Sequence, residues 1–457
     1  MSGKYQAYPE YKDSGVEWLG NIPSHWQVTP IKYLAALNPR KSAIDRTLLN
    51  KECNFLPMEK LKLNSIVLDE KRLVSDVYDG YTYFEDGDVL MAKVTPCFEN
   101  KNIALASGLV NGVGFGSSEI YVLRSNEKTD NRFLYYRLQE DSFMDIATAA
   151  MTGAGGLKRV PSEVVNGYSL GTPEVEEQTQ IANFLDNETA KIGTLIEKQQ
   201  QLIKLLKEKR QAVISHAVTK GLNPEAPMKD SGVAWLGEVP EHWEVTRIKY
   251  LADLTPSKDE VKDNLNSECS FVPMEKLKTD SLKLDEVRLV WDVVGGYTYF
   301  KNGDILLAKV TPCFENKNMA IAQDLKNGIG FGSSEIYVLR PKQKALTEYI
   351  YYRLQEDTFI DLATGEMTGA GGLKRVPSDF LTNFKVALPD PTECSEIVMY
   401  IKHWTKKYDQ LISAALVQVR LMQERRTALI SAAVTGKIDV RNWQTPTSQD
   451  QALEQTA

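Results

Sequence analysis

Two long stretches of the chain carry apolar residues at helical spacing. From Glu177 to about Thr219 there is no proline and one glycine, Gly193, and a stripe of side chains recurs every three or four residues. That stripe is Ile192, Leu195, Gln199, Leu202, Leu206, Arg210, Val213 and Ala217. From about Thr392 to Val434 the pattern returns at Trp404, Tyr408, Leu411, Ala415, Val419, Met422, Arg426, Leu429 and Ala433. The spacing predicts two long amphipathic helices.

The segment before each of these stretches has a different pattern. Short apolar runs bounded by glycine or serine, such as Gly87–Lys93 and Ser118–Arg124, are typical of strands. A shorter run with helical spacing lies between Asp130 and Thr148. Each long helix is therefore predicted to follow a mixed α/β globule.

The chain is one unit repeated twice. Lys12–Gly20 returns with one substitution as Lys229–Gly237, an offset of 217 residues, and from Glu52 onward the offset is 216. The identical blocks are Ala92–Asn102 with Ala308–Asn318, Gly114–Arg124 with Gly330–Arg340, and Met151–Ser162 with Met367–Ser378. A shared task and a recent duplication both explain such identity, and the sequence does not separate them.

These patterns predict an α+β chain with a pseudo-two-fold internal repeat. Two mixed α/β domains are separated by two long antiparallel helices that pair as a coiled coil. The predicted boundaries are 1–176 for the first domain, 177–222 for the first helix, 223–391 for the second domain, 392–440 for the second helix and 441–457 for a disordered polar tail. The alternative is that each helix packs on its own globule.

Composition places the chain among cytoplasmic globular proteins. Of 457 residues, 42% are hydrophobic and 25% charged, and we expect neither a membrane span nor a signal peptide. The five cysteines form no CxxC motif, which predicts reduced thiols and no metal site. A net charge of −7 opposes a nucleic-acid partner, but that sum covers the whole surface whereas DNA contacts one face.

The first candidate DNA-binding segment follows the predicted strand at Gly87–Lys93. Its Thr-Pro-Cys-Phe-Glu-Asn sequence can present a cation, a hydroxyl and an amide to base edges or phosphates. The candidate residues are Lys93, Thr95, Asn100 and Lys101, and in the second repeat Lys309, Thr311, Asn316 and Lys317. The alternative is that these lysines are solvated and the asparagines cap turns.

The second candidate segment is the glycine-rich loop Gly153–Arg159. Clustered glycines allow the backbone to approach a phosphate closely, and the following basic pair supplies charge. The candidate residues are Gly155, Lys158 and Arg159, and in the second repeat Gly371, Lys374 and Arg375. A tight turn with a solvated basic pair is the alternative.

Catalytic motifs are missing from the sequence. It contains no Pro-Pro, which the tetrapeptide of an amino-methyltransferase requires, and no P-loop, HExxH or Ser-His-Asp arrangement. The glycine-rich Gly112–Gly116 leads into a predicted strand instead of a helix, unlike a nucleotide-binding loop. His25 and His242 lie in a Pro-x-His-Trp sequence that suits a domain-opening turn. We expect no catalytic residue.

The order globule, helix, globule, helix resembles the specificity subunits of type I restriction-modification enzymes over nearly the whole chain. The blocks that carry the resemblance are Ser14–Gly20, Ile22–Trp26, Gly87–Leu90, Gly153–Arg159, Pro173 with Glu177–Gln178, and Lys209–Arg210 with Ile214–Ser215. The resemblance implies a non-catalytic DNA-binding protein with two target-recognition domains and a bipartite site on double-stranded DNA.

The resemblance also implies partners. They are two methylation (M) subunits and the restriction or translocase (R) subunits, which carry out the adenine methylation and cleavage that this subunit directs. S-adenosylmethionine, ATP and Mg²⁺ belong to those partners, and none is expected in this subunit. Because the two domains are nearly identical, the target is predicted to be an interrupted palindrome or close to one. The alternatives are a coiled-coil scaffold with two protein-binding domains and the specificity subunit of a related bipartite-cutting system.

Overall fold

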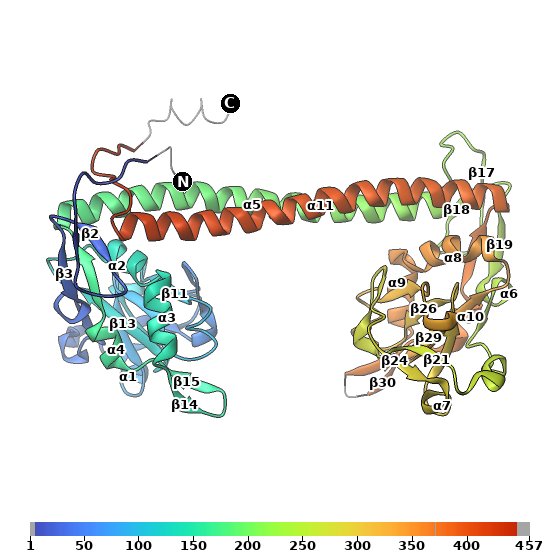
Figure 1. Cartoon of the computed structure of the whole chain (residues 1–457), viewed down its shortest axis with the longest axis horizontal. Helices are drawn as coiled ribbons and strands as arrows, with labels where there is room; N and C mark the ends of the chain where they lie inside the picture. Colours follow the sequence, from blue (N-terminus) through green and yellow to red (C-terminus); the bar gives the residue numbers. More distant parts are fainter. Residues whose placement is uncertain (1–4, 371, 446–457) are drawn as a thin grey trace. The chain divides into compact units, whose positions relative to one another are not determined.

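The computed structural model describes residues 5–370 and 372–445, which form two compact units (Figure 1). Unit 1 is built from residues 1–199 and 417–457, and unit 2 from residues 200–416. The long helices α5 (Val175–Lys220) and α11 (Pro391–Val434) each cross this division. Each unit therefore consists of a globule and one half of each helix, whereas the sequence had suggested helices separate from the domains.

Two four-stranded sheets form the framework of the globule in unit 1. The first is antiparallel in the order β11-β10-β13-β4, and the second, β8-β5-β12-β9, is mixed because β5 and β12 are parallel. The bounds are β4 Ala35–Leu37, β5 Glu52–Leu56, β8 Lys71–Leu73, β9 Thr82–Glu85, β10 Val89–Ala92, β11 Ile103–Leu105, β12 Val113–Gly116 and β13 Ile120–Ser125. The predicted strand segment at Gly87–Lys93 contains β10, and the one at Ser118–Arg124 covers all of β13 except Ser125; these two strands are adjacent in the first sheet.

Short helices and strand pairs complete the globule of unit 1. The helices are α1 Val74–Val77, α2 Asn131–Arg137, α3 Asp141–Ala149 and α4 Ser162–Gly167. The pairs are β1 Tyr11–Asp13 with β2 Asn21–Pro23, β3 Gln27–Pro30 with β16 Ser169–Thr172, β6 Leu61–Lys62 with β7 Ser65–Ile66, and β14 Thr152–Ala154 with β15 Leu157–Arg159. One buried core joins the first sheet and helices α2 and α3 to the helix halves of this unit.

Unit 2 repeats this arrangement with the same strand orders. Its sheets are β20 Ala252–Leu254, β29 Ile336–Pro341, β26 Ile305–Ala308, β27 Met319–Ile321, and β24 Val287–Leu289, β21 Glu268–Val272, β28 Ile329–Gly332, β25 Thr298–Lys301. Its pairs are β17 Met228–Asp230 with β18 Glu238–Pro240, β19 Glu244–Arg247 with β32 Lys385–Leu388, β22 Leu277–Lys278 with β23 Ser281–Leu282, and β30 Thr368–Ala370 with β31 Leu373–Arg375. Its short helices are α6 Ile248–Leu251, α7 Val290–Val293, α8 Thr347–Leu354, α9 Asp357–Gly365 and α10 Ser378–Asn383.

The start and end of α11 follow from local sequence. Pro391 occupies the first turn, where its missing N–H costs nothing, and the Asp390 carboxylate accepts from the backbone N–H groups of Thr392 and Glu393 at 2.8 and 3.0 Å. The helix ends at Val434 because Gly436 adopts a positive φ of 73°. This end agrees with the helical pattern predicted from about Thr392 to Val434, and the remaining residues of the segment 392–440 follow the helix.

The buried stripe of the long helices lies one residue away from the predicted one in places. Leu195 and Leu202 are 48% and 44% exposed, whereas Ile203 is 8% exposed and Ile196 packs against the core of unit 1. The predicted stripe alternates steps of three and four, but an undistorted helix turns 100° per residue, so the inward face drifts along the sequence. Both helix halves pack against the globule core of their unit and, by the Arg210–Asp409 pair, against each other in unit 2.

A fully buried arginine joins each globule to the end of a long helix. Arg137 of α2 donates from Nη1 to the carbonyl of Val434, the last residue of α11, at 2.9 Å. Arg353 of α8 donates in the same way to Val218 in the last turn of α5 at 3.4 Å. A cation at the carboxyl end of a helix is favourably placed with respect to the helix dipole.

The first residues of the segment predicted as a disordered tail contact other parts of unit 1. Trp443 stacks edge-on against Phe184 of α5 with ring centroids 5.6 Å apart, and its carbonyl accepts a hydrogen bond from Gln180. Arg441 pairs with Asp439. The partly buried Trp443 ring thus packs against the core of unit 1. The rest of the predicted tail, residues 446–457, lies outside the described residues.

Candidate nucleic-acid interface

The glycine-rich segment of unit 1 forms a β-hairpin. Strands β14 and β15 pair through Thr152 with Arg159, Gly153 with Lys158 and Ala154 with Leu157, and Gly155 and Gly156 form the turn. All six strand residues are exposed. Figure 1 shows the hairpin projecting from the globule on the side away from the helix halves of unit 1. Gly155 has a φ of 64°, a conformation that glycine adopts at little cost in this turn.

Thr95 fixes the hairpin to the first candidate segment. Its hydroxyl donates to the carbonyl of Gly156 at 2.7 Å and accepts from the backbone N–H of Lys158 at 3.0 Å. Its own N–H donates to the carbonyl of Lys158 at 3.0 Å. The two segments proposed separately from the sequence therefore form one surface, in which Thr95 is engaged by the protein.

Lys158 and Arg159 have different surroundings although they are neighbours. Within the described residues, the exposed Lys158 side chain makes no hydrogen bond or ion pair, so it is available to a phosphate. The Arg159 guanidinium donates from Nε and Nη2 to both carboxylate oxygens of Glu119 at 2.8 Å. These hydrogen bonds hold the pKa of Glu119 below its usual range. Arg159 is thus already neutralised by an acidic partner that lies 40 residues away in sequence.

Lys93 and Asn100 lie at the same surface. The Lys93 ammonium lies 5.2 Å from the centre of the Tyr121 ring, and Lys93 also forms backbone hydrogen bonds with Glu119 and Val160. Asn100 is exposed. Asn100 is thus open to solvent, whereas Lys93 is half-buried beside the Tyr121 ring.

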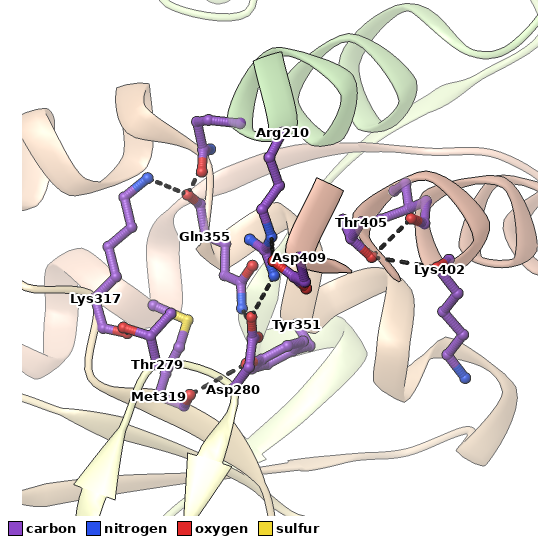
Figure 2. Close-up of polar contacts among 12 residues, drawn as sticks. Arg210, Thr279, Asp280, Lys317, Met319, Tyr351, Gln355, Lys402, Thr405 and Asp409 are labelled. Atoms are coloured by element: carbon purple, nitrogen blue, oxygen red, sulfur yellow. Dashed lines mark hydrogen bonds and ion pairs between the residues drawn. The ribbon is translucent and has the colours of Figure 1, made fainter. Parts of the chain in front are cut away.

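The Lys101 side chain binds other residues of unit 1. Its ammonium donates to the carbonyl of Gln139 at 3.0 Å and to Asp141 at the start of α3 at 2.6 Å. In unit 2 the matching Lys317 donates to the carbonyl of Gln355, as Figure 2 shows, and to Asp357. These contacts connect the loop to the short helices and give both lysines a structural role.

The remaining candidates of unit 2 repeat the geometry of unit 1. The Thr311 hydroxyl donates to Gly372 at 2.8 Å and accepts from the N–H of Lys374 at 3.0 Å. Arg375 pairs with both oxygens of Glu335 at 2.8 Å, and Lys309 lies 5.3 Å from the Tyr337 ring. Asn316 is exposed. Gly371 lies outside the described residues.

The histidines of the Pro-x-His-Trp sequences bind a glutamate in the first turns of the long helices. His25 Nε2 lies 2.7 Å from Glu177, and the same carboxylate accepts from the indole N–H of Trp26 at 3.0 Å. His242 and Trp243 contact Glu393 at the same distances. Trp26 and Trp243 are fully buried, so this contact fixes the beginning of each globule to a long helix, in line with a structural turn.

No group of three or more histidine, cysteine or acidic residues suited to a metal ion occurs within 5–370 and 372–445. Over the same ranges, no helix is long and apolar enough to cross a membrane. The cysteines are unpaired, and burial raises the pKa of the Cys53 and Cys269 thiols to about 11. The arrangement provides a basic, projecting hairpin twice.

Comparison with known proteins relates part of the chain to one family of proteins. Residues 76–205 match the family described as Type I restriction modification DNA specificity domain. The chain is 36% identical over 190 residues to the type I restriction enzyme EcoAI specificity subunit of Escherichia coli, and 36% identical over 197 residues to the EcoEI specificity subunit of the same species. These parts of the chain are therefore similar to type I restriction-modification specificity subunits.

The matches to the Escherichia coli specificity subunits are partial. They cover 41% and 42% of this chain, which spans about a third of the length of each relative, 32% and 33%. A putative type I restriction enzyme specificity subunit of Methanocaldococcus jannaschii, MjaX, is 23% identical over 93% of this chain and 96% of its own. This similarity extends over both repeats.

Solved structures support the fold of a specificity subunit over the same range. A chain from a structure of the type I R-M system superposes with a TM-score of 0.69 at 14% identity, over 91% of this chain and 99% of its own. The HsdS subunit from Thermoanaerobacter tengcongensis superposes with a TM-score of 0.51 at 16% identity, over 91% and 98%. The predicted α+β class with two long antiparallel helices is confirmed.

Proposed function

We propose that this specificity subunit is the DNA-recognition component of a type I restriction-modification complex and has no catalytic centre of its own. The similarity of residues 76–205 to the type I restriction-modification DNA specificity domain supports this role. The observation that carries it is the same exposed hairpin, anchored by a threonine hydroxyl and bearing a lysine beside its glycine-rich turn, in both units. Phosphate contacts from such lysines would position the protein on a duplex.

The target follows from the identity of the two hairpins. Two identical surfaces that meet opposite strands recognise the same short sequence, so the site is bipartite and an interrupted palindrome or close to one. Two methylation subunits and the restriction or translocase subunits act on the bound DNA, and they hold S-adenosylmethionine, ATP and Mg²⁺. The complex works in the cytoplasm, where the DNA is.

The decisive experiment is to co-express the chain with the neighbouring methylation and translocase genes and to map modified adenines over the host genome. We expect one interrupted motif with related half-sites, and no modification when this subunit is omitted. Two unrelated half-sites would contradict the symmetry of the target. Modification that persists without this subunit would contradict the recognition role and favour the scaffold alternative.

A second experiment concerns the two free lysines. Replacing Lys158 and Lys374 together by alanine removes one phosphate contact per unit. The affinity of the complex for a duplex with the mapped motif should fall, and the slope of log affinity against log salt should become shallower by about 1 per lysine. The matched control removes a neutral ion pair from each unit, Arg159→Ala with Glu119→Ala and Arg375→Ala with Glu335→Ala, and should leave the slope unchanged. An unchanged slope for the lysine variant would refute phosphate contact.

A further inference from the structure

Each hairpin carries one large apolar side chain in water. Leu157 is 47% exposed and Leu373 is 48% exposed, on projections whose other residues are small or polar. Both leucines directly follow the glycines of the turn. An exposed apolar group at the tip of a projection contributes nothing to the core of its unit, and its burial would favour binding to a partner.

The backbone that holds each leucine is fixed. A Cβ atom on Gly153 would lie 2.3 Å from the carbonyl oxygen of Leu157, and one on Gly369 would lie 2.2 Å from that of Leu373. Only glycine allows the two strands to approach so closely. Thr95 and Thr311 bind the same turns from the globules. Each leucine is therefore presented on a narrow, anchored ribbon.

The dimensions of such a ribbon select one groove of the duplex. The major groove of B-DNA, about 12 Å wide, admits a two-stranded β-ribbon, whereas the minor groove is only about 6 Å wide. The apolar group that a base edge offers in the major groove is the C5-methyl group of thymine. Lys158 follows Leu157, and successive side chains of a strand point to opposite faces, so the lysine is directed away from the leucine and towards the groove wall.

We propose that Leu157 and Leu373 each contact the methyl group of a thymine in the major groove, one in each half-site. The inference rests on the proposed DNA-recognition function and adds a specificity-determining residue to it. The contact contributes direct recognition of a base, whereas Lys158 and Lys374 contribute affinity without sequence preference.

The experiment uses the complete complex with its partner subunits and duplexes selected from a randomised pool. In the selected duplex, each thymine in turn is replaced by uracil, which lacks only the C5-methyl group. For the wild type we expect one position per half-site at which uracil lowers affinity about fourfold, the effect of burying one methyl-sized group. Leu157→Ala with Leu373→Ala should lower affinity for the thymine duplex. In this variant, replacing thymine by uracil at those positions should no longer change the affinity.

Two variants serve as controls. Leu73→Ala with Leu289→Ala removes another pair of exposed, equivalent leucines, and Lys158→Ala with Lys374→Ala removes the neighbouring charges. Both should keep the full response to uracil. A leucine variant that responds to uracil like the wild type, or a site at which no thymine methyl matters, would overturn the proposal. A pool from which the complex enriches no sequence would instead overturn DNA recognition itself.

Discussion

Units 1 and 2 share their strand orders and their hairpins but differ in the charges that join globule to helix. In unit 1, Arg132 of α2 pairs with Asp186 of α5 at 2.9 Å. The matching residues of unit 2 are Glu348 of α8 and Lys402 of α11, which pair at 2.5 Å with the opposite polarity. The ion pair is kept, but the cation lies on the globule in unit 1 and on the long helix in unit 2. Each globule is therefore matched in charge to the helix half of its own unit. If the partners were exchanged, like charges would face each other.

A second difference lies beside this pair. In unit 2, Arg210 of α5 donates to Asp280 at 2.7 Å and to Asp409 of α11 at 2.9 Å (Figure 2). Burial opposes the charge of the guanidinium, but the two carboxylates raise the pKa of Arg210. The residues of unit 1 that match Asp280 and Asp409 are Asn64 and Gly193. Identical recognition surfaces are thus held on helix contacts that have diverged.

The largest expected difference concerns the buried arginines. Arg353 pairs with the buried Glu356 at 3.0 Å, whereas the nearest approach of Arg137 to Glu140 is 3.8 Å. Arg353→Met should destabilise unit 2 by about 3–5 kcal/mol, because it leaves a buried carboxylate without its partner. Arg137→Met should cost unit 1 less. Hydrogen exchange followed separately in each unit measures both, and Arg353→Met combined with Glu356→Met should recover most of the loss. Equal destabilisation by Arg353→Met and Arg137→Met would contradict the expected difference between the two units.

The Arg210 contact should produce an intermediate effect. Arg210→Met removes hydrogen bonds to two carboxylates and should lower the free energy of unfolding of unit 2 by about 2 kcal/mol. The control is Arg426→Met, because Arg426 is the residue of unit 1 that matches Arg210. Asn64 and Gly193 stand where unit 2 has its two aspartates, so the free energy of unfolding of unit 1 should fall by less than about 1 kcal/mol. Chemical denaturation with hydrogen exchange resolves the two units, and an equal loss would show that the acidic pair adds nothing.

The inverted ion pair should give the smallest effect, because its residues are partly exposed. Arg132→Glu places like charges beside each other and should destabilise unit 1 by about 1 kcal/mol, and adding Asp186→Lys should restore stability by recreating the polarity of unit 2. A double-mutant cycle by thermal denaturation measures the coupling. If Asp186→Lys fails to restore stability, the inversion is incidental.

Periodicity and repetition predicted much of the fold, because long helices and duplicated blocks depend on neighbouring residues. The candidate site was predicted less completely. The sequence identified Lys158 but not the ion pair between Arg159 and Glu119, since nothing in a sequence links residues 40 positions apart before the strands are paired. The ion pair of Lys101 was not foreseen for the same reason, because Asp141 becomes its neighbour only when α3 packs beside the loop. Leu157 was overlooked because an apolar residue in a sequence does not reveal whether it is covered.

The backbone near Gln6 and Asp439 has a consequence for chain topology. The N–H of Asp439 donates to the carbonyl of Gln6 at 2.8 Å in unit 1. In the repeat, both residues correspond to Asn223, where unit 2 has one continuous connection from α5 to its globule. The order globule, helix, globule, helix is therefore circular in this sense: the chain ends near Gln6 and Asp439 correspond to the unbroken connection at Asn223. Joining the chain near residues 6 and 439 and opening it at 223 would produce the same order of elements, with the two recognition domains exchanged in sequence.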